Sequence, residues 1–137
     1  MNTFVMIATL SWGLWGFCQK NASLRMDTIS IQFVSFITGI VLMPIYFYIH
    51  RHEWDISNLN IKGMAWATFA HIFTLVASFS YLRALLSVNV TTVTLTTSAY
   101  PIITFMLAVV LLDEKITIWK LIGIPIVIFG VWISGKT

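Results

Sequence analysis

Within the apolar stretch from Gly63 to Leu82, polar side chains recur at the spacing of a helix. Five of them, three or four residues apart and therefore on one helix face, are Thr68, His71, Thr74, Ser78 and Tyr81. An imidazole can bind a solute by hydrogen bonds or relay a proton, and hydroxyl groups can hydrogen-bond a neutral or zwitterionic solute. Because an ionisable group in the middle of an apolar helix is costly unless it faces a cavity or a partner, we predict that His71 faces one.

Three other apolar stretches also carry small or polar residues on one face. These residues are Thr9, Trp12, Gly16 and Gln19 in the first stretch, Gln32, Ser35 and Gly39 in the second, and Thr94, Thr97, Pro101 and Thr104 in the fourth. Trp12 lies deeper than Trp15 and offers a ring that can stack on an organic solute. Pro101, which follows Tyr100, removes a backbone donor and predicts a bend. We predict a polar cavity lined by Trp12, Gly16, Gln19, Gln32, His71, Thr74, Ser78, Tyr81, Thr97, Tyr100 and Pro101.

Each of these residues also has a purely structural interpretation. Small and hydroxylated residues allow helices to pack closely in lipid, and tryptophan anchors helices at the membrane surface. A neutral His71 that bonds to a neighbouring Ser or Thr would stabilise the bundle without touching a solute. The combination of four such faces favours the cavity. Lys20 and Arg83 lie near span ends, where we expect their side chains to reach the membrane surface.

Membrane-spanning helices are the elements that must position these faces. The 137-residue chain is 58% hydrophobic and 9% charged, so it cannot build a water-facing surface. Its apolar stretches, which approach the ~20 residues that a spanning helix needs, are Phe4 to Cys18, Ile29 to Ile49, Gly63 to Leu82, Ala84 to Leu112 and Ile116 to Ser134. They are apolar at successive positions, which excludes the alternation of a membrane β-barrel. We predict an all-α, multi-pass protein of the cell membrane with one five-helix domain over residues 1–137.

The first stretch does not have the pattern of a cleavable signal, because no Lys or Arg precedes it and no small-residue cleavage pattern follows it. We therefore expect it to remain in the mature protein. Five spans place the two termini on opposite faces of the membrane. Each face then collects four basic residues: Arg51, Lys62, Lys115 and Lys120 on one, and Lys20, Arg25, Arg83 and Lys136 on the other. This tie leaves almost no positive-inside bias, so insertion in either orientation is plausible, although the tie can also be an accident of counting.

Catalysis is not supported by any arrangement of residues in this chain. His50, His52, Glu53 and Asp55 have metal-ligand chemistry, but alternate positions in a short loop do not converge on one point. No nucleophile, base and orienting group can be assembled at one membrane depth. Cys18 has no partner cysteine, and we expect it to be a small buried residue. We predict no enzyme, no metal site and no cofactor.

The net charge of +3 comes from Lys and Arg residues that flank the spans. This placement suits anionic lipid headgroups. Nucleic acid is excluded as a partner, because no basic stripe with interleaved aromatic residues lies outside the spans.

The last stretch differs from the others because it carries almost no polar residue. Gly123 and Gly130, seven residues apart on one face, predict a helix used for packing or for dimer contact. Thr117 is a plausible cap for this helix, and the charges of Asp113 and Glu114 favour its amino-terminal end.

The order of these motifs resembles the EamA-type unit of the drug/metabolite transporter superfamily. The resemblance rests on Trp12-Gly13-Leu14-Trp15-Gly16-Phe17 with Lys20, on Ala84 through Ser98 and Tyr100-Pro101, and on Leu111-Leu112-Asp113-Glu114-Lys115-Ile116-Thr117 with Gly123 and Gly130-Val131. It covers nearly the whole chain. The chain departs from the usual pattern in having Lys115 where arginine is common, and one five-helix unit where two are common.

The resemblance implies a secondary transporter of a small organic metabolite that works by alternating access. Two-unit members are inverted repeats around a central site, so one unit needs a second: another copy in the opposite orientation, or a sister half-unit. Other possibilities are a non-transporting accessory or lipid-moving subunit, and an exporter of the small multidrug-resistance type. The last uses an acidic residue in its first span, and no span of this chain contains one.

Overall fold

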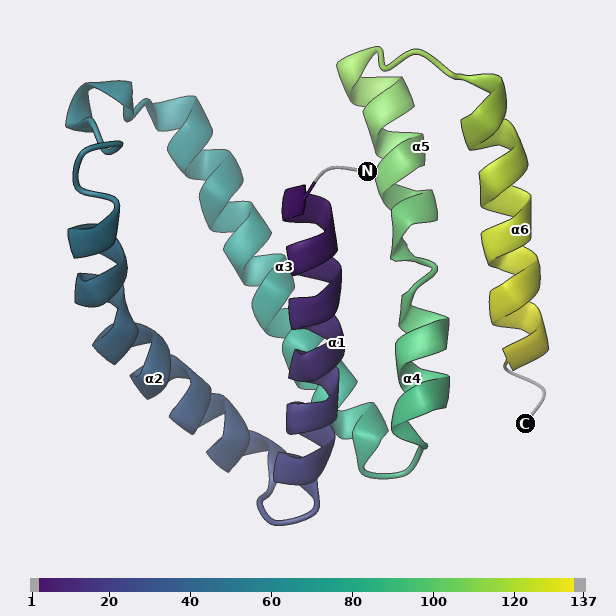
Figure 1. The fold of residues 1–137 in the computed structure, drawn as a ribbon, viewed down its shortest axis with the longest axis horizontal. Helices are drawn as coiled ribbons and strands as arrows, with labels where there is room; N and C mark the ends of the chain where they lie inside the picture. The colour runs from purple at the N-terminus through teal and green to yellow at the C-terminus, as the bar shows by residue number, and fades with distance from the viewer. Residues whose placement is uncertain (1–2, 135–137) are drawn as a thin grey trace. The chain divides into compact units, whose positions relative to one another are not determined.

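The computed structural model describes residues 3–134, and in this range it contains helices and no strand (Figure 1). The helices are α1 (Thr3–Ser23), α2 (Thr28–Ile49), the short 3-10 helix η1 (Ile56–Asn58), α3 (Ile61–Leu85), α4 (Val90–Thr97), α5 (Tyr100–Leu112) and α6 (Ile118–Ser134). The prediction of an all-α fold is therefore confirmed.

Five helical segments correspond to the five predicted spans, with α4 and α5 together forming the fourth. Three segments of the described chain are long and apolar enough to cross a membrane by themselves: Thr28–Ile49, Ile61–Leu85 and Val90–Leu112. Helix α6 is a shorter apolar helix of 17 residues, and α1 is 21 residues long with a more polar carboxyl end. The α1 helix exceeds the ~20 residues that a crossing needs, and α6 falls slightly below it.

Several predicted helix ends were wrong by a few residues. Helix α1 continues past Cys18 to Ser23, and α3 continues through Arg83 to Leu85. The fourth span consequently begins at Val90 and not at Ala84. Hydropathy reports where lipid ends, whereas a helix continues into the polar boundary wherever its backbone hydrogen bonds are preserved.

Pro101 produces a full interruption where the sequence predicted a bend. Its ring nitrogen has no hydrogen to donate to the Thr97 carbonyl, and the helix breaks over Ser98 and Ala99. The Ile102 N–H instead bonds to the Ala99 carbonyl at 3.0 Å, in a tighter turn. The Ser98 hydroxyl donates to the Thr94 carbonyl at 2.7 Å, so side chains stabilise the last turn of α4.

Helices α2 and α3 begin at side chains that cap them. Asp27 accepts hydrogen bonds from the backbone N–H groups of Ile29 and Ser30, at 2.9 and 3.0 Å. Asn60 accepts one from the Gly63 N–H at 2.8 Å. These bonds satisfy donors that the first helical turn leaves unpaired, and they fix where each span starts.

Packing divides the chain after Leu86 into two compact units. In the first unit, α1, α2 and α3 pack against one another, and Leu82 and Leu85 are completely buried. In the second unit, α4 packs against α6, with Val93 and Ala108 buried. The single-domain organisation over residues 1–137 stays a prediction.

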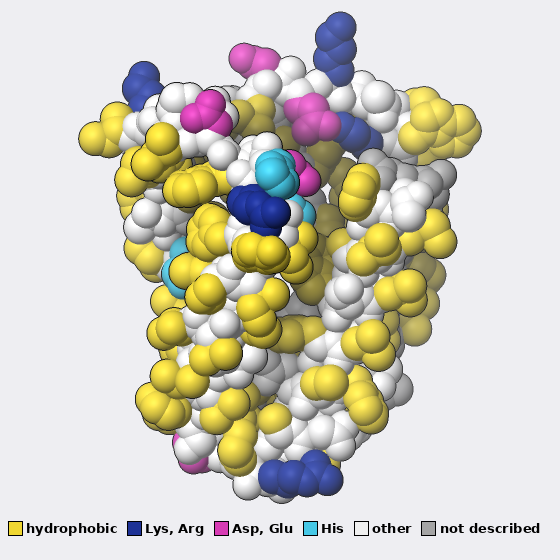
Figure 2. All heavy atoms as spheres, turned by 60° about the vertical axis from the view of Figure 1, so that its left-hand side comes forward, with side chains coloured by type: hydrophobic (Ala, Val, Ile, Leu, Met, Phe, Trp, Pro, Cys, Tyr) yellow, Lys and Arg dark blue, Asp and Glu magenta, His cyan; other side chains and the backbone are white. Residues whose placement is uncertain are grey.

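Apolar side chains cover the outside of the helices. Phe4, Trp66, Phe73 and Trp119 are at least 70% exposed. In Figure 2, hydrophobic side chains cover the visible helix surfaces, and acidic and basic side chains lie mainly toward the helix ends. Such a surface is stable in hydrocarbon and not in water, which confirms the membrane assignment.

Lys20 ties the carboxyl ends of α1 and α3 together. Its Nζ donates a hydrogen bond to the Leu85 carbonyl at 2.6 Å, across 65 positions of sequence. This carbonyl belongs to the last residue of α3, where unpaired acceptors carry partial negative charge that a cation offsets. Lys20 was expected only to reach the membrane surface, but it also makes a specific contact inside the first unit.

We predict that Asp27→Ala lowers the thermal stability of the protein in nanodiscs at neutral pH. The Ser30 hydroxyl and the Ser30 and Ile29 N–H groups hold the pKa of Asp27 below its usual 3.8. Its contribution is therefore fully present above that value and is lost as pH falls through the lowered native pKa. Asp27→Asn, which can cap but cannot ionise, is the control. Equal melting temperatures for the two variants at pH 7 would contradict the capping role.

We predict that Lys20→Met lowers the free energy of unfolding in mixed micelles by about 1–2 kcal/mol, because it removes a charged donor from a helix end. Titration with a denaturing detergent measures this difference. Lys62→Met, at an exposed lysine at the start of α3, is the matched control and should leave stability unchanged. If both variants lost the same stability, the contact with Leu85 would have no special role.

Candidate functional site

The first unit brings together four predicted site residues from three helices. The Ser78 hydroxyl of α3 donates to Gln32 Oε1 of α2 at 3.4 Å. On the neighbouring turn of α3, the Tyr81 ring lies 5.1 Å from the Trp15 ring of α1, centroid to centroid. Gln19, one turn after Trp15, is buried. Polar and aromatic groups therefore line the zone where the carboxyl halves of α1 and α3 meet α2.

Two residues of this zone were not among the predicted site residues. The Trp15 ring lies tilted against the Tyr81 ring, whereas the sequence favoured Trp12, whose side chain is 63% exposed on α1. Thr28, at the start of α2, is 3% exposed, and its Oγ1 has no hydrogen-bond partner within residues 3–134. Which of two tryptophans meets a neighbouring helix depends on helix rotation, so sequence spacing alone could not identify Trp15. Gly16, also predicted, is buried in the same region.

His71 and Thr74 are exposed on α3, and no hydrogen bond or ring contact joins either of them to Ser78, Gln32 or Trp15. The Thr74 hydroxyl bonds to the Ala70 carbonyl of its own helix at 2.9 Å, and the Thr68 hydroxyl bonds to the Met64 carbonyl in the same way. In the described part of the chain, His71 has no hydrogen-bond, ion-pair or ring partner. The interpretation that His71 bonds to a Ser or Thr of its own bundle is therefore wrong for this protomer.

The second unit groups Thr97, Tyr100 and Pro101 at the break between α4 and α5. The Thr97 hydroxyl donates to the Val93 carbonyl at 2.8 Å, and so belongs to the last turn of α4. Tyr100 and Pro101 are exposed at the start of α5. They line an open groove of about 480 Å³ between α5 and α6, together with Thr104, Phe105, Ala108, Gly123 and Lys120.

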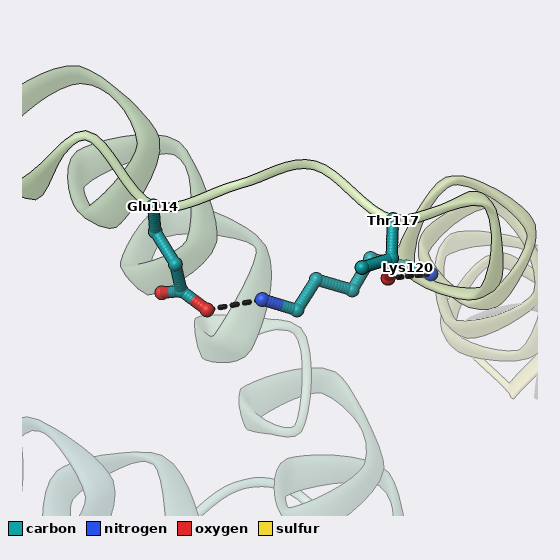
Figure 3. Close-up of polar contacts among 3 residues, drawn as sticks. All are labelled: Glu114, Thr117 and Lys120. Atoms are coloured by element: carbon teal, nitrogen blue, oxygen red, sulfur yellow. Dashed lines mark hydrogen bonds and ion pairs between the residues drawn. The ribbon is translucent and has the colours of Figure 1, made fainter.

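An ion pair links the two ends of the α5–α6 connection (Figure 3). The Glu114 carboxylate and the Lys120 ammonium point toward each other and form a salt bridge. Thr117 Oγ1 accepts from the Lys120 N–H at 3.4 Å, as predicted for a cap of α6. Asp113 ends α5 in the left-handed conformation, at φ 52°, and so belongs to the preceding helix.

Among residues 3–134, the glycines of α6 have no close neighbour outside their own helix. A Cβ atom added at Gly123 or Gly130 would meet no atom within 4 Å. Gly123 borders the groove beside α5, and Gly130 is exposed. Close packing within the bundle therefore does not account for these two residues, and their use in dimer contact stays a prediction.

The polar loop between α2 and α3 is organised by its own contacts. His50 Nδ1 lies 3.4 Å from a Glu53 carboxylate oxygen. Asp55 accepts from the Ser57 N–H at 2.9 Å and caps η1, and this hydrogen bond lowers the pKa of Asp55. Within residues 3–134, no group of three potential ligands is placed to hold a metal ion.

The single cysteine of the chain, Cys18, lies in α1. Cys18 is exposed in this protomer, so the expectation of a small buried residue was wrong. The side chain faces outward because Gly16 and Gln19, on another side of α1, take the buried positions.

Of the eight basic residues in the four-against-four count, Lys136 lies outside the described residues.

Comparison with known proteins identifies the family. The family model of the EamA-like transporter family matches residues 1–135. Searches of curated proteins and of solved structures each found no match. Because the family model matches nearly the entire chain, and the helices have the length and composition of membrane spans, this chain belongs to the EamA-like transporter family of membrane proteins.

Proposed function

We propose that this protein is one half of a secondary transporter for a small organic metabolite in the cell membrane, and that two inverted copies form the passage. The observation that carries the proposal is the position of His71, which is exposed on a membrane-spanning helix and has no partner in its described protomer. Lipid cannot supply hydrogen bonds to an imidazole, so the functional state needs a cavity or a second protomer at this point.

The side chains available to a solute favour neutral or zwitterionic compounds. Hydroxyl, amide and aromatic groups from Ser78, Gln32, Trp15 and Tyr81 meet in the first unit. Hydroxyls and amides both donate and accept hydrogen bonds, and the rings bind the apolar body of an organic molecule. An anionic solute is the second candidate, because the Lys20 ammonium lies at the edge of the same zone.

The acidic residues argue against proton exchange through a carboxylate inside a span. All five of them lie outside the six α-helices: Asp27, Glu53, Asp55, Asp113 and Glu114. Asp27 and Asp55 cap helices, and Glu114 pairs with Lys120. An exporter of the small multidrug-resistance type is therefore disfavoured.

The interruption at Ser98 and Ala99 supports a mechanism with moving parts. Alternating access requires a helix segment that can change direction inside the membrane, and transporters place broken helices at such points. Hydroxyl groups of α4 already bond to the carbonyls next to the break. Movement of α5 about this break would therefore preserve hydrogen bonds that lipid could not replace.

The even distribution of basic residues supports the inverted arrangement of the two copies. With four Lys or Arg residues expected on each face, insertion has little reason to prefer one orientation. Both orientations would then be present in one membrane and could pair. A heterodimer with a sister half-unit is the competing arrangement.

We predict that purified protein in liposomes takes up at least one member of a panel of radiolabelled neutral and zwitterionic metabolites. His71→Gln should reduce that uptake about ten-fold or more, because an amide keeps a hydrogen-bond donor and acceptor but cannot take up and release a proton as an imidazole does. His52→Gln, at a loop histidine, is the matched control and should retain full uptake, with equal amounts of protein in each preparation.

Two outcomes would contradict this proposal. A protein that moves no member of the panel would fit an accessory or lipid-moving subunit. Full uptake by the His71→Gln variant would remove this residue from the passage while leaving transport itself intact.

We predict that a reporter active only in the cytoplasm gives comparable signals from either end of the chain. Five spans put the two ends on opposite faces, so a single orientation would activate the reporter at one end only. Adding three lysines to the loop between α2 and α3 is the control, because it should move the signal toward one end. A strong signal from one end of the unmodified chain would exclude dual topology.

A further inference from the structure

We propose that α3 docks on α3 of a second, inverted copy, and that the two His71 rings bond to each other on the two-fold axis. This inference rests on the antiparallel dimer of the proposed function and identifies the surface and the residue that each copy contributes.

The first step is the depth of His71 in its helix. It lies ten residues after Ile61 and fourteen before Leu85, close to the middle of α3. The two-fold axis of an antiparallel membrane dimer runs in the plane of the membrane, at mid-depth. A residue that lies at mid-depth on the contact surface therefore meets its own counterpart, whereas residues nearer either end meet different ones.

The second step is the pattern around His71, which reads the same in both directions. Thr68 lies three residues before it and Thr74 three residues after it, and all three side chains are exposed on α3. When an inverted copy is laid against this surface, Thr68 of one copy faces Thr74 of the other. The surface is thus complementary to itself under the symmetry that the charge distribution permits.

The third step is the chemistry of the contact. A neutral imidazole has one N–H donor and one acceptor nitrogen, so two such rings can satisfy each other with an N–H···N hydrogen bond. The Thr68 and Thr74 hydroxyls already donate to carbonyls of their own helix, at 2.9 Å each. They therefore present little unsatisfied polarity to the partner, and the imidazole pair is the central polar contact.

The consequence for transport is a shared site. Two rings on the symmetry axis are equally distant from both faces of the membrane, so a solute that displaces their mutual hydrogen bond meets the same groups from either side. The site is incomplete in one protomer, which accounts for the exposed imidazole of α3.

Cross-linking between cysteines tests both the contact surface and the relative orientation of the two copies. The background is Cys18→Ser, because the native cysteine is exposed. His71→Cys should form a disulfide-linked dimer in membranes upon mild oxidation. Phe73→Cys is the matched control, since Phe73 is 70% exposed at nearly the same depth but on the opposite side of α3. It should form no dimer.

Cysteines away from the centre then distinguish inverted from parallel pairing. Thr68 lies three residues before His71 and Thr74 three after it, and all three are exposed on one face of α3. In an inverted dimer, differently tagged Thr68→Cys and Thr74→Cys chains should form a disulfide with each other. Two Thr68→Cys chains should not, because their positions are about 9 Å apart along the helices at 1.5 Å per residue.

The expected results are dimers at position 71 and in the mixed 68–74 pair, with no dimer at position 73. Joined Thr68→Cys chains would overturn the inverted register, and absence of a dimer at position 71 would overturn the surface. Liposome uptake by the Cys18→Ser background is measured in parallel. Uptake without cross-linking refutes this contact while the proposed function stands, and loss of both refutes the proposed function.

The imidazole bond is tested separately from the surface. In lipid, His71→Ala should weaken dimerisation by about three- to twenty-fold, as measured by energy transfer between labelled copies, because one interhelical hydrogen bond is lost. His71→Gln retains a donor and an acceptor and should restore most of the affinity. If the two variants bound equally well, side-chain hydrogen bonding would not contribute to the contact.

Discussion

A span in lipid must find all its hydrogen bonds within protein, and this constraint accounts for most features of the chain. Backbone groups are satisfied by continuous helices, and at the one interruption within a span, next to Pro101, hydroxyls of Thr97 and Ser98 bond to nearby carbonyls. Carboxylates, which are hard to satisfy in hydrocarbon, are confined to the connections. The Lys20 ammonium bonds to the unpaired carbonyl end of α3. The mid-span imidazole of His71, which has no partner in the described part of the chain, is the exception to this constraint.

Sequence patterns predicted the spans well because the relevant signals are local. An apolar run of about twenty residues has few alternatives to a membrane helix. A proline removes a backbone donor wherever it occurs, which breaks the helix before Pro101, although α2 and α6 continue through Pro44 and Pro125. The ends of α1 and α3 were predicted less well. Gln19, Lys20 and Asn21 reduce hydropathy but do not disfavour a helix, so α1 continues through them to Ser23.

The contacts between helices could not be read from the sequence, because they depend on how each helix is rotated. The Trp15 ring lies against the Tyr81 ring, a contact that the sequence did not predict because it favoured Trp12 for the cavity. The Lys20–Leu85 bond joins residues 65 positions apart, for which no local pattern exists. Spacing along one helix predicts which side chains share a face, as it did for Thr68, His71 and Thr74. It does not predict what that face contacts.

Exposure has a different meaning for the two kinds of surface on this protein. An exposed Phe73 or Trp66 is stable in hydrocarbon and needs no partner, whereas an exposed His71 at similar depth is not. Gly123 and Gly130 of α6 are comparable, because a Cβ atom added at either would lie in open space among the described residues. Small residues in lipid allow another helix to approach closely, and among residues 3–134 no neighbour outside the helix lies within 4 Å of such a Cβ. Helices α3 and α6 therefore each present a surface whose composition is not explained by packing among the described residues of one chain.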